Sequence, residues 1–180
     1  ESEDRYDPTV PRETKVLHVA GGSILKGTQA VLDAWEQYHL PYLLTVIGDE
    51  QVVKPRPIPN VTYLKWVEDA ELKRLQNSHS VHLQPSETEG WGHTIWEGLG
   101  VNARVLTTDQ EIPVAPWLQG EVHGVRCLSP LIRVKSETIA FKVGHEFAMT
   151  DLQEPSPRSY FLKNREQFRA RLKALVDDHV

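Results

Sequence analysis

Short apolar segments rich in β-branched residues alternate with amphipathic segments along the first part of the chain. Runs at 15–22, 42–47, 61–64, 81–84 and 104–108 predict strands, because each is short and is bounded by glycine, proline or polar residues. Apolar side chains at helical spacing predict helices at about 30–38, 68–77 and 92–101. Asn102 follows the last of these, where a left-handed residue commonly ends a helix. The alternation is typical of an α/β domain.

The remainder of the chain is less regular. Residues 112–157 contain scattered prolines and glycines and predict only short strands near 125–128 and 145–148. A C-terminal helix is predicted around 161–175, with apolar residues on one side and a charged, solvent-exposed opposite face. We therefore predict a Rossmann-like, doubly wound parallel sheet over residues 15–180, preceded by a linker or strap at 1–14. Ligands of such domains bind at the carboxyl ends of the strands.

Composition and charge narrow the functional classes. The 180 residues are 39% hydrophobic and 25% charged, as in a globular domain, and no run approaches the ~20 apolar residues of a membrane span. A net charge of -5 without a basic helix face argues against nucleic acid as a partner. Cys127, the only cysteine, cannot form an internal disulfide, which favours a cytoplasmic location. We expect no signal peptide at the N-terminus and, without a clustered His or Cys motif, no bound metal.

Three segments that could carry chemistry follow predicted strands, at 21–26, 66–69 and 85–97. The third places Gly90 and Gly92 directly before a predicted helix. The first N–H groups of a helix have no partners within it and attract anions, and glycine lets a ligand approach the main chain closely. This segment therefore predicts a phosphate site.

Two glutamates flank the predicted phosphate site. Glu89 precedes the helix, and Glu97 lies about two turns inside it. Carboxylates accept hydrogen bonds, which suits them to hold the hydroxyls of two sugars in one elongated ligand. The same two residues are also compatible with an ordinary acid near a helix start and a surface glutamate.

The pattern Pro85-Ser86-x-x-Glu89-Gly90-x-Gly92-x-x-x-x-Glu97 resembles the signature of retaining GT-B glycosyltransferases, of the glycosyl transferases group 1 or family 4 type. Residues 16–27, 44–49 and 60–86 resemble, in order, further strands and the first phosphate loop of the donor-binding C-terminal domain. The resemblance is good over 15–109 and weak beyond. It implies the C-terminal half of a GT-B fold.

The resemblance also implies roles for individual residues. In this family the acid that matches Glu89 binds hydroxyls of the transferred sugar, and the acid that matches Glu97 binds the ribose. The lysine that matches Lys26 neutralises the departing diphosphate, so Glu89 and Lys26 are the expected catalytic residues. Taken alone, Lys26 is also compatible with a solvated lysine at a helix start.

The start of the predicted helix supplies the other expected diphosphate contacts. Backbone amides of residues 91–94 face the diphosphate in the family, and Thr94 adds a hydroxyl donor. His93 is compatible with a phosphate donor and equally with an exposed bystander. An arginine that often precedes the family lysine is absent here, and we expect an amide of Gly22 and the hydroxyl of Ser23 to substitute for it.

Tryptophans and two further departures affect the expected base contacts. Trp66 is expected to border the nucleotide base, and Trp91 either contacts the ligand or braces the glycine loop. Lys65 and residues 102–104 replace glycine-containing family positions, a departure that affects the expected base contacts more than the fold. The remaining helical tryptophans, Trp35 and Trp96, are expected in the core.

The function implied is transfer of a hexose-type sugar, with retention, from a nucleoside diphosphate donor such as a UDP or GDP sugar to an acceptor, in polysaccharide or glycoconjugate biosynthesis. The expected partners are the nucleotide sugar and an N-terminal acceptor-binding domain absent from this chain, so the domain alone should be inactive. With a lipid-linked acceptor, the protein would work at the inner face of a membrane. A sugar-nucleotide epimerase or hydrolase and a non-catalytic binding or scaffolding module remain alternatives.

Overall fold

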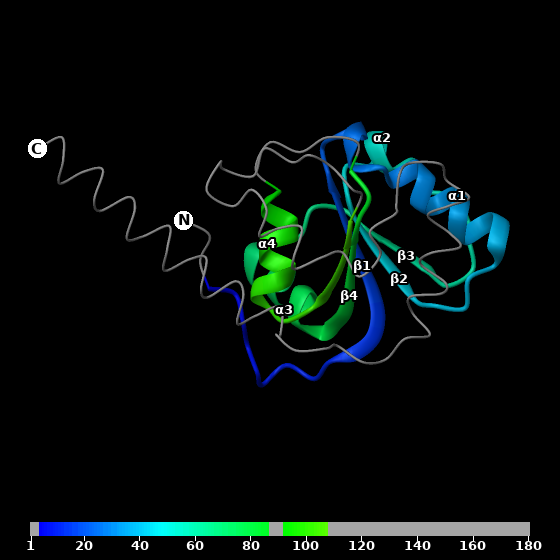
Figure 1. Cartoon of the computed structure of the whole chain (residues 1–180). Coiled ribbons are helices and arrows are strands. Elements are labelled where there is room, and N and C mark those ends of the chain that lie inside the picture. Colours follow the sequence, from blue (N-terminus) through cyan, green and yellow to red (C-terminus); the bar gives the residue numbers. More distant parts are fainter. Residues whose placement is uncertain (1–3, 87–91, 108–180) are drawn as a thin grey trace, which may run out of the picture.

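A computed structural model describes residues 4–86 and 92–107, which form a five-stranded parallel sheet with helices on both faces (Figure 1). The strands are β1 (Glu13–Gly21), β2 (Leu44–Gly48), β3 (Val61–Leu64), β4 (His79–Gln84) and β5 (Arg104–Thr107). The helices are α1 (Thr28–Tyr38), α2 (Glu50–Val53), α3 (Asp69–Ser78) and α4 (His93–Gly100), with a 3-10 turn, η1 (Ile24–Lys26). The predicted Rossmann-like α/β fold is confirmed.

Each strand and helix predicted before residue 108 is present, with ends that agree to within two residues. The left-handed conformation expected at Asn102 is confirmed by its φ of 61°. Neither η1 nor α2 was predicted, because three or four residues are too few to show a helical period. The predictions for residues 108–180, including Cys127 and the C-terminal helix, lie outside the described residues.

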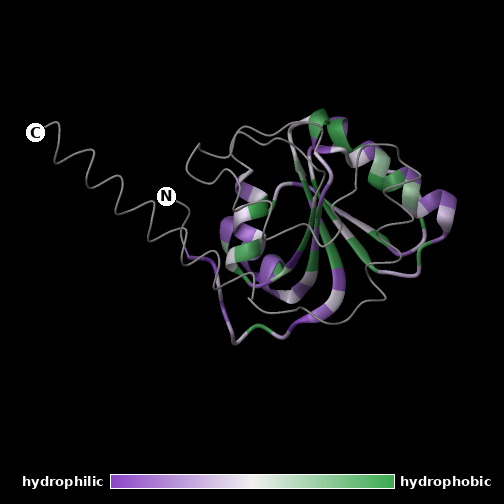
Figure 2. Cartoon of the chain, in the orientation of Figure 1, coloured by the Kyte–Doolittle hydropathy of each residue, from purple (hydrophilic) through white to green (hydrophobic). Residues whose placement is uncertain are grey.

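The helices divide between the two faces of the sheet, with α1 and α2 on one side and α3 and α4 on the other (Figure 1). Alternate residues of β1 face these two layers, so Val16 packs in the cluster beneath α1 and Leu17 packs with Leu75 of α3. Trp35 and Trp96 are buried, as predicted. Figure 2 shows hydrophobic positions concentrated where the helices meet the strands.

The order of the strands is β3-β2-β1-β4-β5. The chain moves outward from β1 through β2 to β3 on one side, then returns to place β4 and β5 on the other side. The carboxyl ends of β1 and β4 therefore lie next to each other while their following segments turn to opposite faces. In open α/β sheets a crevice forms at such a switch point, and ligands bind there.

None of the helices in the described ranges is both long and apolar enough to cross a membrane.

Candidate functional site

Eight of the predicted site residues lie in the described part of the chain: Gly22, Ser23, Lys26, Trp66, Gly92, His93, Thr94 and Glu97. All eight belong to the segments that follow β1 and β3 or to α4 and its cap. Glu89, Gly90 and Trp91 lie outside the described residues, so their predicted roles stay predictions.

The loop after β1 is shaped by its glycines and by Ser23. Gly21, at φ 58°, turns the chain out of the strand. Ser23 then caps η1, and its Oγ accepts a hydrogen bond of 3.3 Å from the backbone N–H of Leu25. Because this bond uses a lone pair of the hydroxyl, the Ser23 proton can still be donated to a ligand. Beside it, a Cβ atom at Gly22 would meet no atom of the described residues within 4 Å, so these residues leave the backbone there open to approach.

Gly27 holds the segment after β1, residues 22–27 (the Lys26 loop), against the end of β4. Its backbone is left-handed, at φ 72°, and a Cβ atom here would lie 3.0 Å from the carbonyl carbon of Pro85 and closer still to its oxygen. Only glycine permits this approach without strain. Lys26, which is half-buried, is thereby held beside the start of the loop that leads to α4.

The segments that follow β2 and β3 border the same carboxyl ends of the sheet, beside the turn after β1. The N–H of Asp49 donates to the Gly21 carbonyl at 3.0 Å, which ties the end of β2 to the turn after β1. Trp66, in the loop after β3, is 69% exposed, and its Cη2 lies 3.9 Å from the position that a Cβ of Gly21 would occupy. The indole therefore borders the Gly21 turn with much of its surface available to a ligand.

Gln84, the last residue of β4, fixes the orientation of Thr94. Its Nε2 donates to the Val19 carbonyl at 3.0 Å and to Thr94 Oγ1 at 2.8 Å. Since the Thr94 oxygen accepts here, its hydroxyl proton can point toward a ligand. Gln84 is 2% exposed, and its Oε1 makes no hydrogen bond within the described ranges. Sequence reasoning missed this role, for which a polar residue at the end of an apolar strand is the only signal.

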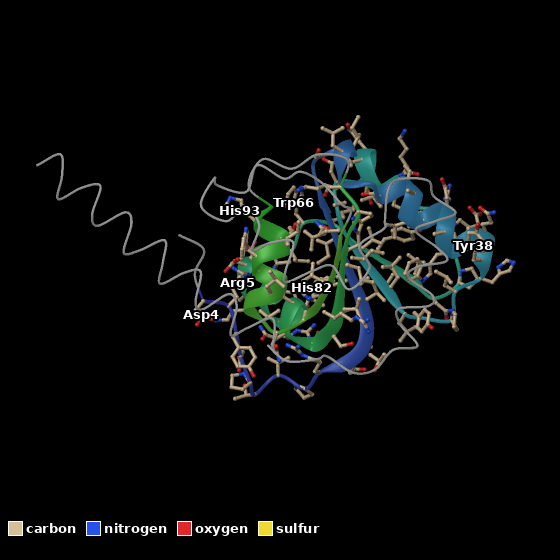
Figure 3. All side chains as sticks on the ribbon, viewed as in Figure 1. Asp4, Arg5, Tyr38, Trp66, His82 and His93 are labelled. Carbon is tan, nitrogen blue, oxygen red and sulfur yellow. The ribbon has the colours of Figure 1, made fainter. Side chains whose placement is uncertain are left out.

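The start of α4 has the features of an anion site. Gly92 caps the helix at φ 70°, without a side-chain hydrogen bond, and its carbonyl accepts the first helical bonds from Ile95 and Trp96 at 2.9 and 3.1 Å. The amides ahead of these bonds lie at the positive end of the helix dipole. Figure 3 shows the exposed His93 on the α4 side of the sheet, on the same side as Trp66.

Glu97 lies one turn further along α4 and is half-buried. Gln76 of α3 donates from Nε2 to Glu97 Oε2 at 2.7 Å. The other carboxylate oxygen, Oε1, receives no hydrogen bond that the described residues supply. One oxygen is therefore fixed while the second can accept from a ligand hydroxyl.

A buried histidine ties the elements of the site together. His18 of β1 lies 2.8 Å through Nδ1 from the Leu83 carbonyl and 2.9 Å through Nε2 from Thr28 Oγ1. A carbonyl only accepts, so Nδ1 carries the proton and the threonine hydroxyl donates to Nε2. Burial lowers the pKa of His18 to about 4, and it lowers the pKa of His82 to about 3. Both rings are therefore neutral in the folded protein near pH 7.

These two histidines should make the protein acid-sensitive. In the unfolded chain a histidine has a pKa of about 6.5, so the unfolded state binds more protons below that pH. The free energy of unfolding should therefore be fully retained above pH 6.5 and fall as the pH drops toward 4, with a limiting slope of about 1.4 kcal/mol per pH unit for each histidine. Urea denaturation at pH 7.5, 6.5, 5.5 and 4.5 measures this slope. His82→Gln should reduce it, whereas His39→Asn, at an exposed left-handed position, should not. Equal slopes in all three proteins would contradict the expectation.

Among residues 4–86 and 92–107, no three His, Cys, Asp or Glu side chains group in a way that could bind a metal ion.

No protein-family model matches this sequence, and no curated protein matches it. The fold is nevertheless shared with solved structures of glycosyltransferases. The chain aligns with WaaG, a glycosyltransferase involved in lipopolysaccharide biosynthesis, over 92% of its length at 16% identity and a TM-score of 0.60. It aligns with the pneumococcal O-GlcNAc transferase GtfA, in complex with UDP and GlcNAc, over 89% of its length at 17% identity and a TM-score of 0.55.

A third similar structure is an isolated domain. The C-terminal domain of LpcC, a glycosyl transferase group 1 family protein from Francisella tularensis, aligns over 79% of this chain and 78% of its own length, at 19% identity and a TM-score of 0.55. By contrast, the chain spans only 49% of WaaG and 31% of GtfA. At these identities the likeness shows the fold alone, a Rossmann-like α/β fold that this chain shares with the glycosyltransferase structures.

Proposed function

We propose that this chain is the donor-binding domain of a retaining glycosyltransferase, which transfers a hexose-type sugar from a nucleoside diphosphate to an acceptor. The observation that carries the proposal is the convergence of three groups at the switch point of the sheet. These are the Lys26 loop, packed through Gly27 against Pro85; the Thr94 hydroxyl, oriented by Gln84; and the start of α4. Together they offer a cation, a hydroxyl and backbone amides to one anionic ligand.

The proposed catalysis rests on charge stabilisation. As the bond from the sugar to the diphosphate breaks, negative charge develops on the diphosphate, and Lys26 together with the amides and Thr94 hydroxyl at the start of α4 would stabilise it. Ser23 and the open backbone at Gly22 would supply the contacts that the absent arginine makes elsewhere. Catalysis of this kind needs no metal, and we propose none.

The two ends of the donor would be held by other residues. Glu97, with one oxygen free of hydrogen bonds from the described residues, would accept from the ribose hydroxyls, and Trp66 would contact the base with its exposed indole face. Glu89 would hold hydroxyls of the transferred sugar. The presence of UDP and GlcNAc in the GtfA structure supports a nucleotide sugar as ligand, with UDP the first nucleotide to test.

The acceptor would bind to a second, N-terminal domain. The chain covers about half of WaaG, which is consistent with one domain of a two-domain enzyme. Because WaaG is involved in lipopolysaccharide biosynthesis, we extend the proposal to a glycoconjugate acceptor, and to work on the cytoplasmic side of a membrane surface if that acceptor is lipid-linked.

Calorimetric titration of this chain with UDP, GDP and ADP, each with and without EDTA, tests the proposal. We expect saturable binding of one diphosphate, unaffected by EDTA and weakened by Glu97→Ala, and much weaker binding of the matching nucleoside. If no diphosphate binds at millimolar concentration, or the nucleoside binds as well as the diphosphate, the donor-site assignment is wrong.

A second experiment uses a preparation that also contains an acceptor domain. The anomeric configuration of its product distinguishes retention from inversion, and release of free sugar would indicate a hydrolase.

A further inference from the structure

The segment before β1 packs against the helices that carry the proposed ribose site. Arg5 is only 7% exposed and lies against α3 (Figure 3). Its Nε donates to Gln76 Oε1 at 2.6 Å, its Nη1 forms an ion pair of 2.9 Å with Asp69 Oδ1, and its Nη2 donates to the Asp69 carbonyl at 3.2 Å. All three guanidinium nitrogens are therefore engaged on one helix.

Further bonds fix the same segment along α3 and past the end of α4. Asn77 Nδ2 donates to the Arg5 carbonyl at 2.8 Å, and the N–H of Asp7 donates to Asn77 Oδ1 at 2.8 Å. Arg12 Nε donates to the Asn77 carbonyl at 3.2 Å, and the same guanidinium bonds to the carbonyls of Val101 and Asn102 after α4. Residues 5–12 thus bridge the C-terminal ends of both helices.

The bonds of Gln76 fix the direction of its amide. Arg5 Nε can only donate, so the Gln76 oxygen must face Arg5. The Gln76 Nε2 must then face Glu97, whose carboxylate accepts its hydrogen bond at 2.7 Å. Gln76 is 1% exposed, so its amide cannot turn to water instead. A directed series of hydrogen bonds therefore runs from Arg5 through Gln76 to Glu97.

From this geometry we propose that Arg5 and Gln76 are positioning residues for Glu97, so that the segment before β1 sets the carboxylate that binds the ribose. The proposal rests on the function proposed above. Without the Gln76 amide, the Glu97 side chain would be free to adopt other rotamers. The entropy cost of ordering this side chain would then offset part of the binding free energy of each ribose contact. Displacement of residues 5–12 would have the same effect.

A comparison of ligands with and without ribose hydroxyls tests the proposal. The probes are UDP, GDP and ADP and the 2′,3′-dideoxy form of each, titrated into the wild-type chain, Gln76→Leu and Gln76→Glu. In the wild type, loss of the hydroxyls should weaken binding roughly tenfold or more, as for hydrogen bonds to a charged group. In both variants that ratio should fall to about twofold, because the ribose contact has already been weakened.

Gln76→Glu keeps nearly the same shape and an acceptor for Arg5, so it leaves no cavity, but it places a carboxylate oxygen where the amide donated to Glu97 and thus removes the donor by different means from Gln76→Leu. Arg5→Met should lower the ratio as well, and Arg5→Lys, which can still bond to Gln76 Oε1, should restore part of it. Gln29→Leu is the matched control. Gln29 of α1 also donates from Nε2, at 2.6 Å to the Val53 carbonyl, but it lies on the opposite face of the sheet, so the wild-type ratio should be retained.

The outcomes separate the two proposals. If the wild type binds no diphosphate, the proposed function is wrong and this inference falls with it. If the wild type discriminates against the dideoxy ligand and the Gln76 variants keep the same ratio, even with weaker binding overall, the donor site stands and the positioning role is overturned. A wild-type ratio near one would overturn Glu97 as the ribose ligand, and with it the role of Gln76.

Discussion

Gly27→Ala should lower the free energy of unfolding by about 2–5 kcal/mol. Left-handed strain should contribute about 1–2 kcal/mol and overpacking about 1–3 kcal/mol. The new Cβ would meet the Pro85 carbonyl, which belongs to the backbone and cannot rotate away as a side chain would. A loss of this size is a large fraction of the total stability of an ordinary domain. Urea unfolding followed by circular dichroism measures it.

Gly22→Ala is the matched control for this prediction. A Cβ at Gly22 meets no atom within 4 Å in residues 4–86 and 92–107, and the φ of Gly22 is not in the left-handed region. The free energy of unfolding of Gly22→Ala should therefore stay within about 0.5 kcal/mol of the wild-type value. If Gly27→Ala is as stable as Gly22→Ala, the close packing of the Lys26 loop against the end of β4 does not exist in solution.

Lys26→Met should weaken the binding of the preferred nucleoside diphosphate by roughly 10- to 100-fold, the size expected when a hydrogen bond to a charged group is lost. Binding of the matching nucleoside, which has no phosphate, should be unchanged, because Met keeps the length and apolar stem of the side chain. Titration calorimetry with both ligands at one ionic strength measures the two constants.

Lys15→Met provides the comparison for overall charge. Lys15 lies near the start of β1, at the amino-terminal ends of the strands and thus away from the proposed site, and it forms an ion pair of 2.8 Å with Glu13. Its removal lowers the net charge of the chain by the same amount as Lys26→Met but should leave diphosphate binding within about twofold. Equal weakening by both variants would show that the effect of Lys26 is only long-range electrostatics.

The sheet and its main helices could be predicted from sequence because their apolar residues follow clear periods. β1 alternates between two buried faces, and α1 presents Val31, Leu32 and Trp35 to the core. Strand ends were less predictable, since polar residues such as Glu13 and His79 extend β1 and β4 beyond the apolar runs. Backbone hydrogen bonds to the neighbouring strand hold these polar residues in the sheet. The pattern of side chains along the sequence gives no signal for such bonds.

Part of the candidate site could also be predicted, because loops after parallel strands meet at one edge. The structure brings the Lys26 loop, Trp66 and the start of α4 to that edge. The supporting residues could not be predicted. Gln76 and Gln84 are ordinary polar residues in sequence, and their importance depends on partners from other elements, with Arg5 separated from Gln76 by 71 positions.

The central position of β1 has a consequence for how the domain folds. β1, β2 and β3 are consecutive in the chain and can pair one after another, whereas β4 must pair back with β1, with Val81 beside Val16. Closing the long segment between these two residues costs more chain entropy than each earlier step, and non-local parallel pairing is slow. The crevice at the β1–β4 boundary should therefore form last during folding, so that nucleotide binding would report completion of the native sheet rather than its onset.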